Sequence, residues 1–264
     1  MRHPRSAGVA TPASVVLAGA LIAISLTAWL LVLRASASMS MSASMPMAGP
    51  GTSPSIAEGT AFTLQWGVMM TAMMLPSAAP MILLYRTVSR RLSAGGDSSI
   101  PAALFATVYI SLWLLSGVPV YGGYVAMSAL AARWPALGAA MPYAVAAVLV
   151  AAGAYQLTDA KRVCLRHCEA PLGFLMRRWR SGYAATLRLA FEHAGYCIGC
   201  CWALMSILVV AGAMSITWVL AIAVVVFAEK VLPHGWRTAR FVGVSLLALG
   251  VAVAVHPALA VALR

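Results

Sequence analysis

Methionine is concentrated in one short apolar stretch, VMMTAMMLPSAAPM, at residues 68–81. A helix advances about 100° per residue, so the methionines of this stretch fall on one side of it. They are Met69, Met70, Met73, Met74 and Met81. Their uncharged thioether sulfurs suit a soft monovalent ion such as Cu(I). Methionine is also an adaptable filler between packed helices, so this stretch alone leaves a metal-binding face and a packing face both open.

A second methionine cluster lies in SASMSMSASMPMAGPGTSPS, residues 36–55. This segment is rich in Ser, Ala, Gly and Pro, a composition that does not form a packed core. Its methionines therefore have no core to fill, and they are Met39, Met41, Met45 and Met47. We expect them to collect Cu(I) or Ag(I) in a compartment where free cysteines would be oxidised. Compositional drift in a low-complexity segment is the alternative.

The five cysteines fall in two short stretches, and they are Cys164, Cys168, Cys197, Cys200 and Cys201. Spacings of three and four residues put the thiols of each stretch on one helical face. The segment CIGC has the C-x-x-C spacing of metal and redox sites, and His167 and His193 stand beside the two sets as further candidate ligands. We expect both sets to converge on one site for Cu(I), with zinc as the other candidate. Two separate low-coordinate Cu(I) sites are the alternative.

The elements that must position these residues are membrane helices. The chain is 62% hydrophobic and 9% charged, with a mean hydropathy of +0.90, whereas soluble domains average about 25% charged residues. Seven apolar segments are long enough to cross a bilayer, near residues 13–33, 61–85, 101–129, 139–158, 195–213, 215–232 and 238–258. We therefore predict an all-α polytopic membrane helix bundle of seven transmembrane helices. The third of these carries Gly and Pro residues that predict a bend or a break.

The net charge of +12 is explained better by topology than by nucleic-acid binding, because no basic arm is present. With the N-terminus inside, the predicted inner segments hold all of the 18 Lys and Arg residues except Arg34, Arg133 and Arg264. This excess predicts the N-terminus in and the C-terminus out. We expect a multi-pass protein in the lipid bilayer of a bacterial-type inner (plasma) membrane, with no nucleic-acid partner.

The chain divides into three predicted regions. Residues 1–34 form an anchor span or a signal whose cleavage would leave six spans. Residues 35–60 form the disordered Met-rich external loop, and residues 61–258 form the helix bundle with the metal-binding motifs. The longest polar loop of the bundle, the cytoplasmic loop 159–194, contains a basic amphipathic stretch. That stretch is expected as a helix either along the inner leaflet or in solvent.

Glu229 and Lys230 end the sixth predicted span. Charges in such a place are costly unless they are paired or near water. The two residues therefore predict either a structural ion pair with a lysine that reaches toward the membrane surface, or a role in ion exit.

Four separated motifs of this chain together resemble a known family. They are WGVMMTAMMLPSAAP at residues 66–80, YQLTDAKRVCLRHCEAP at residues 155–171, YCIGCCWALM at residues 196–205, and the pair Glu229-Lys230. In this order they resemble the DUF2182 family of predicted metal-binding integral membrane proteins, some of them labelled copper chaperones. The resemblance covers about residues 60–255 and implies metal handling.

Together these features predict a protein that binds a soft metal ion and acts in copper transfer, uptake or chaperoning, and not an enzyme. Methionines outside and in the second span would receive Cu(I), and the cytoplasmic cysteines and histidines would hold it or hand it over. A metallochaperone or a copper enzyme is the expected partner. Two alternatives remain open, namely a membrane thiol–disulfide oxidoreductase using Cys197 and Cys200, and a scaffold for copper-enzyme assembly.

Overall fold

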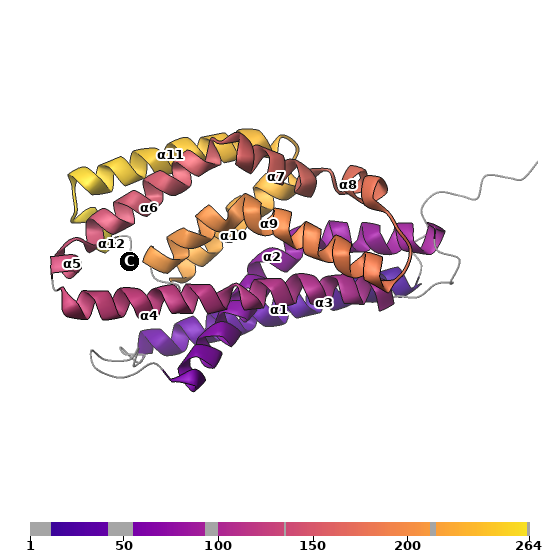
Figure 1. The fold of residues 1–264 in the computed structure, drawn as a ribbon, viewed down its shortest axis with the longest axis horizontal. Helices are drawn as coiled ribbons and strands as arrows, with labels where there is room; N and C mark the ends of the chain where they lie inside the picture. The colour runs from indigo at the N-terminus through magenta and orange to yellow at the C-terminus, as the bar shows by residue number, and fades with distance from the viewer. Residues whose placement is uncertain (1–11, 42–54, 93–99, 135, 212–214, 263–264) are drawn as a thin grey trace, which may run out of the picture.

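The computed structural model describes residues 12–41, 55–92, 100–134, 136–211 and 215–262. In these ranges the chain forms helices joined by short connections and contains no strand (Figure 1). The helices are α1 (Pro12–Met41), α2 (Ile56–Leu92), α3 (Ile100–Leu115), α4 (Gly117–Arg133), α5 (Ala136–Ala139), α6 (Met141–Gln156), α7 (Asp159–Glu169), α8 (Pro171–Arg178), α9 (Tyr183–Ala211), α10 (Ile216–Val231), α11 (Gly235–Val255) and α12 (Leu259–Ala262). The all-α prediction is confirmed for this part of the chain.

Within the described ranges, five helical segments are long and apolar enough to cross a membrane. They are Pro12–Ala37, Ile56–Leu92, Ile100–Arg133, Tyr183–Val210 and Gly235–Val255. The pair α6 and α7 meets the same criterion as a sixth segment, bent by 64°. The expected sixth span corresponds to α10, whose 16 residues reach only about 24 Å across a hydrocarbon core of roughly 30 Å. A multi-pass membrane protein is supported, whereas the predicted count of seven spans is not reached. The orientation of the termini stays a prediction.

The third predicted span is interrupted at the expected place, between α3 and α4. The interruption falls at Ser116, directly before Gly117. The Ser116 hydroxyl donates to the Trp113 carbonyl at 2.6 Å and accepts a hydrogen bond from Trp66 Nε1 at 3.0 Å. The second bond ties the junction to α2, and α3 and α4 together form one membrane-long segment (Figure 1).

Two predicted loops are partly helical. α1 runs on to Met41 and α2 begins at Ile56, so only residues 42–54 of the predicted external loop lie outside the described residues. The predicted cytoplasmic loop is largely taken up by α7, α8 and the first turns of α9. α9 begins at Tyr183, well before the expected start near residue 195, because its amphipathic first turns continue directly into the apolar segment.

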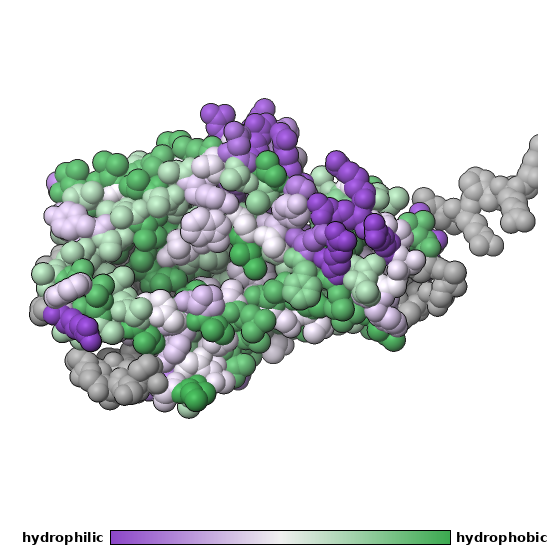
Figure 2. Space-filling view, in the orientation of Figure 1, coloured by the Kyte–Doolittle hydropathy of each residue, from purple (hydrophilic) through white to green (hydrophobic). Residues whose placement is uncertain are grey.

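Apolar residues cover much of the outer surface, as a lipid-facing bundle requires. Figure 2 shows hydrophilic side chains gathered over α7 and α8, while α6 and α11 carry mostly apolar ones. α6 and α11 pack closely along their length, and a Cβ at Gly153 would lie 2.7 Å from the Gly243 carbonyl oxygen. α9 packs against α3, α6 and α7, and α2 packs against α1, α3 and α10. This arrangement directs α2, α7, α9 and α10 toward one buried region.

Candidate metal site in the helix bundle

The methionine face of α2 is buried. The five side chains are no more than 4% exposed, and they are Met69, Met70, Met73, Met74 and Met81. α2 also contains Pro76 and Pro80, each of which removes a backbone hydrogen bond and favours a kink. Figure 1 shows α2 changing direction along its length. The predicted single face therefore exists, and it points into the bundle.

Three cysteines share one face of α9. Cys197, Cys200 and Cys201 are each 1% exposed. The Cys200 and Cys201 thiols donate to the Cys197 carbonyl oxygen at 3.1 and 2.9 Å. Such bonds to the carbonyl three or four residues back are the usual way for a short side chain inside a helix to satisfy its donor. All five cysteines of the chain are free thiols in the structure.

α7 brings the other two cysteines to α9. Cys168 of α7 and Cys197 of α9 line one cavity, and α7 packs directly against α9. Cys164 lies against Gly199, where an added Cβ would stand 3.0 Å from the Cys164 sulfur. The glycine of CIGC thus permits the close approach of α7 to α9. The two cysteine stretches lie side by side, as predicted from the sequence.

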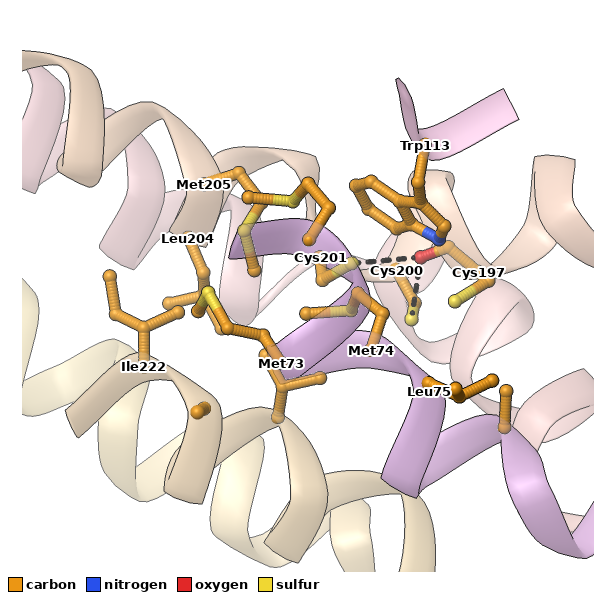
Figure 3. Close-up of a cluster of buried hydrophobic side chains, with 14 of the residues drawn as sticks. Met73, Met74, Leu75, Trp113, Cys197, Cys200, Cys201, Leu204, Met205 and Ile222 are labelled. Carbon is orange, nitrogen blue, oxygen red and sulfur yellow. Dashed lines mark hydrogen bonds between the residues drawn. The ribbon is translucent and has the colours of Figure 1, made fainter. Parts of the chain in front are cut away.

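The methionines and the cysteines belong to one buried cluster. Figure 3 shows Met73 and Met74 of α2 beside Cys197, Cys200 and Cys201 of α9. The sequence predicts these methionines in the second span and the cysteines at the cytoplasmic face. Because α9 begins at Tyr183, Cys197 lies about 20 Å along that helix. The position of the cysteines relative to the membrane faces stays a prediction.

Lys230 joins the two sets of sulfurs. Its Nζ lies 2.9 Å from the Cys197 sulfur and 3.8 Å from the Met74 sulfur, and the side chain is only 7% exposed. The Tyr109 hydroxyl lies 3.0 Å from the same Cys197 sulfur. Of the two roles predicted for this pair, a lysine that reaches toward the membrane surface is wrong, because Lys230 points into the bundle; a role in ion exit stays a prediction. Lys230 places a positive charge beside the sulfur atoms.

Glu229 is held by side chains of two other helices. Lys161 Nζ of α7 lies 2.6 Å from Glu229 Oε2, and Gln156 Nε2 of α6 donates to Oε1 at 2.7 Å. Lys161 Nζ also donates to the Cys200 carbonyl oxygen. This buried network ties α6, α7, α9 and α10 together. It leaves Lys230 without the carboxylate of its chain neighbour.

The two candidate histidines have different surroundings. His193 is 4% exposed, its Nδ1 has no hydrogen-bond partner, and its ring packs among Phe105, Tyr109 and Phe174. His167 stacks on Tyr196 with ring centroids 4.0 Å apart, and its Nδ1 lies 2.8 Å from the Val163 carbonyl oxygen. His193 therefore lines the same cavity as Cys168 and Cys197, whereas His167 is held by Tyr196 and by the Val163 carbonyl oxygen.

A cavity of about 130 Å³ lies beside the cluster. Its lining residues come from α2, α3, α7, α9 and α10, with Pro171 from the start of α8, and they are Ser77, Ala78, Pro80, Met81, Tyr109, Cys168, Glu169, Pro171, His193, Cys197, Lys230 and Val231. Room for an ion is thus present where α7 and α9 each present a cysteine.

The atoms of this cluster that could bind a metal ion are mainly sulfur atoms, and few of them face one position. In the ranges that the structure describes, no three His, Cys, Asp or Glu side chains are arranged to hold one metal ion. Structural zinc normally requires four such ligands, whereas thiol and thioether sulfurs favour Cu(I). The donor set fits a soft monovalent ion better than zinc. The predicted convergence of all five cysteines on one ion stays a prediction.

Sequence reasoning missed Met205 and Tyr109 as site residues. Met205 is 4% exposed and lies near Cys201 in Figure 3. A signal for it was present, because Cys197, Cys201 and Met205 repeat every four residues along one helical face. Tyr109 carried no such signal, since its contact with Cys197 joins residues 88 positions apart.

The external methionines are only partly placed. Met39 and Met41 lie in the last turn of α1, and Met45 and Met47 lie outside the described residues. Their predicted role as metal collectors stays a prediction.

A family model described as PpoB2, copper chaperone, matches residues 63–253. That range contains the α2 methionines, all five cysteines and Lys230, and it begins after the methionines at residues 39–47. No curated protein and no solved structure matches the chain.

Proposed function

Because the chain belongs to the PpoB2 family of copper chaperones, we propose that it binds Cu(I) as its cargo inside the membrane and hands the ion to a partner. The carrier site would lie between α2, α7 and α9. In this proposal the protein carries a metal ion and is not an enzyme. The family membership supports the copper-related role, and the chemistry of the buried side chains supports the location of the site.

The single observation that carries the location is the joint contact of Lys230 Nζ with the sulfurs of Cys197 and Met74, at 2.9 and 3.8 Å. These two side chains come from different helices and are both fully enclosed. A thiol and a thioether next to one cation position form the kind of donor set that selects Cu(I) over harder ions. Packing alone does not require a charged group in this place.

The order of ligand types favours inward delivery. Neutral thioethers bind Cu(I) weakly, and thiolates bind it strongly, so an ion that enters along the methionine face moves downhill toward the cysteines. The basic residues over α7 and α8 favour the cytoplasmic side for that end. An inner-membrane protein that feeds a cytoplasmic metallochaperone or a copper enzyme follows from this proposal, and a scaffold for copper-enzyme assembly would use the same site.

Direct metal binding tests the proposal. The full chain, purified in detergent micelles, is titrated with Cu(I) in competition with a chromophoric Cu(I) chelator, and separately with Zn(II). We expect one tightly bound Cu(I) per chain, and strong loss of that binding in Cys197→Ser. The variant Cys164→Ser, altered at the rim of the cluster, is the matched control and should keep most of it. Absence of Cu(I) binding by the folded wild-type chain would refute the proposed function.

The oxidoreductase alternative receives less support from the site. Thiol–disulfide exchange needs an accessible thiolate that reaches the disulfide of a substrate. Cys197 and Cys200 are each 1% exposed, and the Cys200 thiol is occupied by the Cys197 carbonyl oxygen. A buried ion of atomic size can reach these sulfurs more readily than a protein disulfide can.

A further inference from the structure

Lys230 carries the one buried charge of the cluster that the proposed function does not yet use. Its ammonium stands 2.9 Å from the Cys197 sulfur, the place where a bound cation would also have to approach. A carrier of cations would lose affinity from a lysine there unless the loaded site were itself an anion. The charge of Lys230 therefore indicates that the site carries a net negative charge when the ion is bound.

The thiols of the cluster divide into two kinds. Cys200 and Cys201 donate to the backbone at 3.1 and 2.9 Å, and neither lines the cavity. Cys168 and Cys197 both line the cavity together with Lys230, and Cys197 lies beside the Lys230 ammonium. The two thiols that face the open space thus come from α7 and α9, one from each helix.

We infer that Cys168 and Cys197 hold a soft monovalent ion as a two-thiolate anion, and that Lys230 is the fixed counter-cation that makes this site selective for monovalent ions. The inference rests on the proposed function and specifies its ligands. One positive ion and two thiolates carry a net charge of −1, which the Lys230 ammonium cancels. Each thiol that binds the ion releases its proton to the medium.

The balance of charges at this site makes a divalent ion less favourable than a monovalent one. A divalent ion between two thiolates forms a neutral group and leaves the Lys230 charge unbalanced in a buried place, which is costly. A third thiolate would restore balance, but no three such donors are arranged for one ion among the described residues. Two sulfurs suffice for Cu(I) or Ag(I), whereas zinc sites normally take four ligands.

The neighbouring charges do not change this balance. Lys161 and Glu229 compensate one another at 2.6 Å. Glu169, which also lines the cavity, has an Oε1 atom without a hydrogen-bond partner and lies against Gly235 at the start of α11, with Arg166 nearby. A carboxylate at a helix N-terminus is partly neutralised by the helix dipole. Lys230 is left as the uncompensated cation facing the cavity in the described part of the chain.

Substitution of Lys230 tests the inference on the full chain purified in detergent. Cu(I), Ag(I) as its redox-inert substitute and Zn(II) are titrated into wild type, Lys230→Met and Lys230→Arg. Lys230→Met keeps the volume and removes the charge, so we expect the ratio of Cu(I) to Zn(II) affinity to fall at least roughly tenfold. Lys230→Arg keeps the charge and should retain most of the wild-type ratio. Arg177→Gln, which removes an exposed charge from α8, is the matched control and should leave the ratio unchanged.

X-ray absorption on the copper-loaded protein adds a direct count of ligands, with two sulfurs expected in the wild type and fewer in Cys168→Ser. A Lys230→Met protein that binds Cu(I) with an unchanged ratio overturns the counter-cation role. Three or four sulfurs at the bound copper overturn the two-thiolate site. If Lys230→Met does not fold, Lys230→Gln, which also removes the charge, replaces it in the same titrations. A wild-type chain that binds no Cu(I) at all would instead count against the proposed function.

Discussion

Lys161 and Glu229 form a buried ion pair in which Nζ and Oε2 are 2.6 Å apart and neither side chain is more than 1% exposed. The pair joins α7 to α10 and so sets the direction in which the next residue, Lys230, enters the bundle. Buried ion pairs add little net stability over apolar residues, but removal of one partner leaves an uncompensated charge. The pair is thus a device for positioning Lys230.

Lys161→Met should destabilise the protein by about 3–5 kcal/mol, because Glu229 would remain buried and charged without a partner. The double variant Lys161→Met with Glu229→Leu should recover much of that loss. Thermal unfolding in detergent, followed by circular dichroism, measures both effects. The single variant Glu229→Leu completes the cycle, and a loss in the double variant equal to the sum of the two single losses would show that the two residues do not interact energetically.

The methionine face of α2 should act in copper binding and not only in packing. Changing Met69, Met70, Met73 and Met74 together to Leu conserves volume and apolarity, and such swaps usually cost less than about 1.5 kcal/mol each. We expect a folded protein that takes up Cu(I) more slowly, measured by time-resolved chelator competition, because the ion enters along this face before it reaches Cys168 and Cys197. Leucine at the exposed Met127 and Met176 is the matched control. An unchanged rate of Cu(I) uptake in the fourfold variant would show that the face serves packing only.

Much of the architecture followed from local patterns. Apolar run length predicted a helical membrane bundle, and the 100° period predicted the buried face of Met70 and Met74. The start of α9 was predicted too late, because the stretch from Tyr183 is amphipathic and basic, and polarity was taken as a loop signal. The count of spans failed at α10, whose apolar run is long enough only when the residues on either side of the helix are included.

The site was predictable by residue type and less so by geometry. Spacing of three and four residues identified Cys197, Cys200 and Cys201 as one set, and proximity of two helix ends predicted their approach to Cys168. The contacts of Lys230 with Met74 and Cys197 join residues 156 and 33 positions apart. Such contacts depend on how α2, α9 and α10 pack, which a single sequence does not specify.

The external methionines should raise copper capture only when copper is scarce. Changing Met39, Met41, Met45 and Met47 to Ser removes weak ligands that act by raising the local ion concentration near the carrier. Copper accumulation by cells should fall at low external copper and match the wild type at high copper. An equal deficit at every concentration would point to a structural or essential role.

Thiol labelling should distinguish the surroundings of the five cysteines and the sides of the membrane. Cys164, which is half-buried on α7, should react slowly with an impermeant maleimide from the cytoplasmic side only. Cys197, Cys200 and Cys201, each 1% exposed, should react only after denaturation in SDS. Single-cysteine variants and mass spectrometry identify the labelled residue. Labelling of Cys197 or Cys200 from the outside would show that the orientation is opposite to the predicted one and would support the oxidoreductase interpretation.

Cys168 and Cys197 should behave as one unit in metal binding. If both sulfurs hold the same ion, Cys168→Ser and Cys197→Ser should each remove most of the Cu(I) affinity, and the double variant should lose little more. Two independent sites would instead give additive losses.

The matched comparison pairs Cys197→Ser with Cys164→Ser, because Cys164 also lies on α7 but contacts Gly199 and does not line the cavity. These two losses should add. Serine keeps the size of the side chain and removes the soft ligand, so the affinities report coordination, and unfolding temperatures measured in parallel exclude a general loss of structure. Additive losses for Cys168 and Cys197 would assign the two helices to separate low-coordinate copper sites.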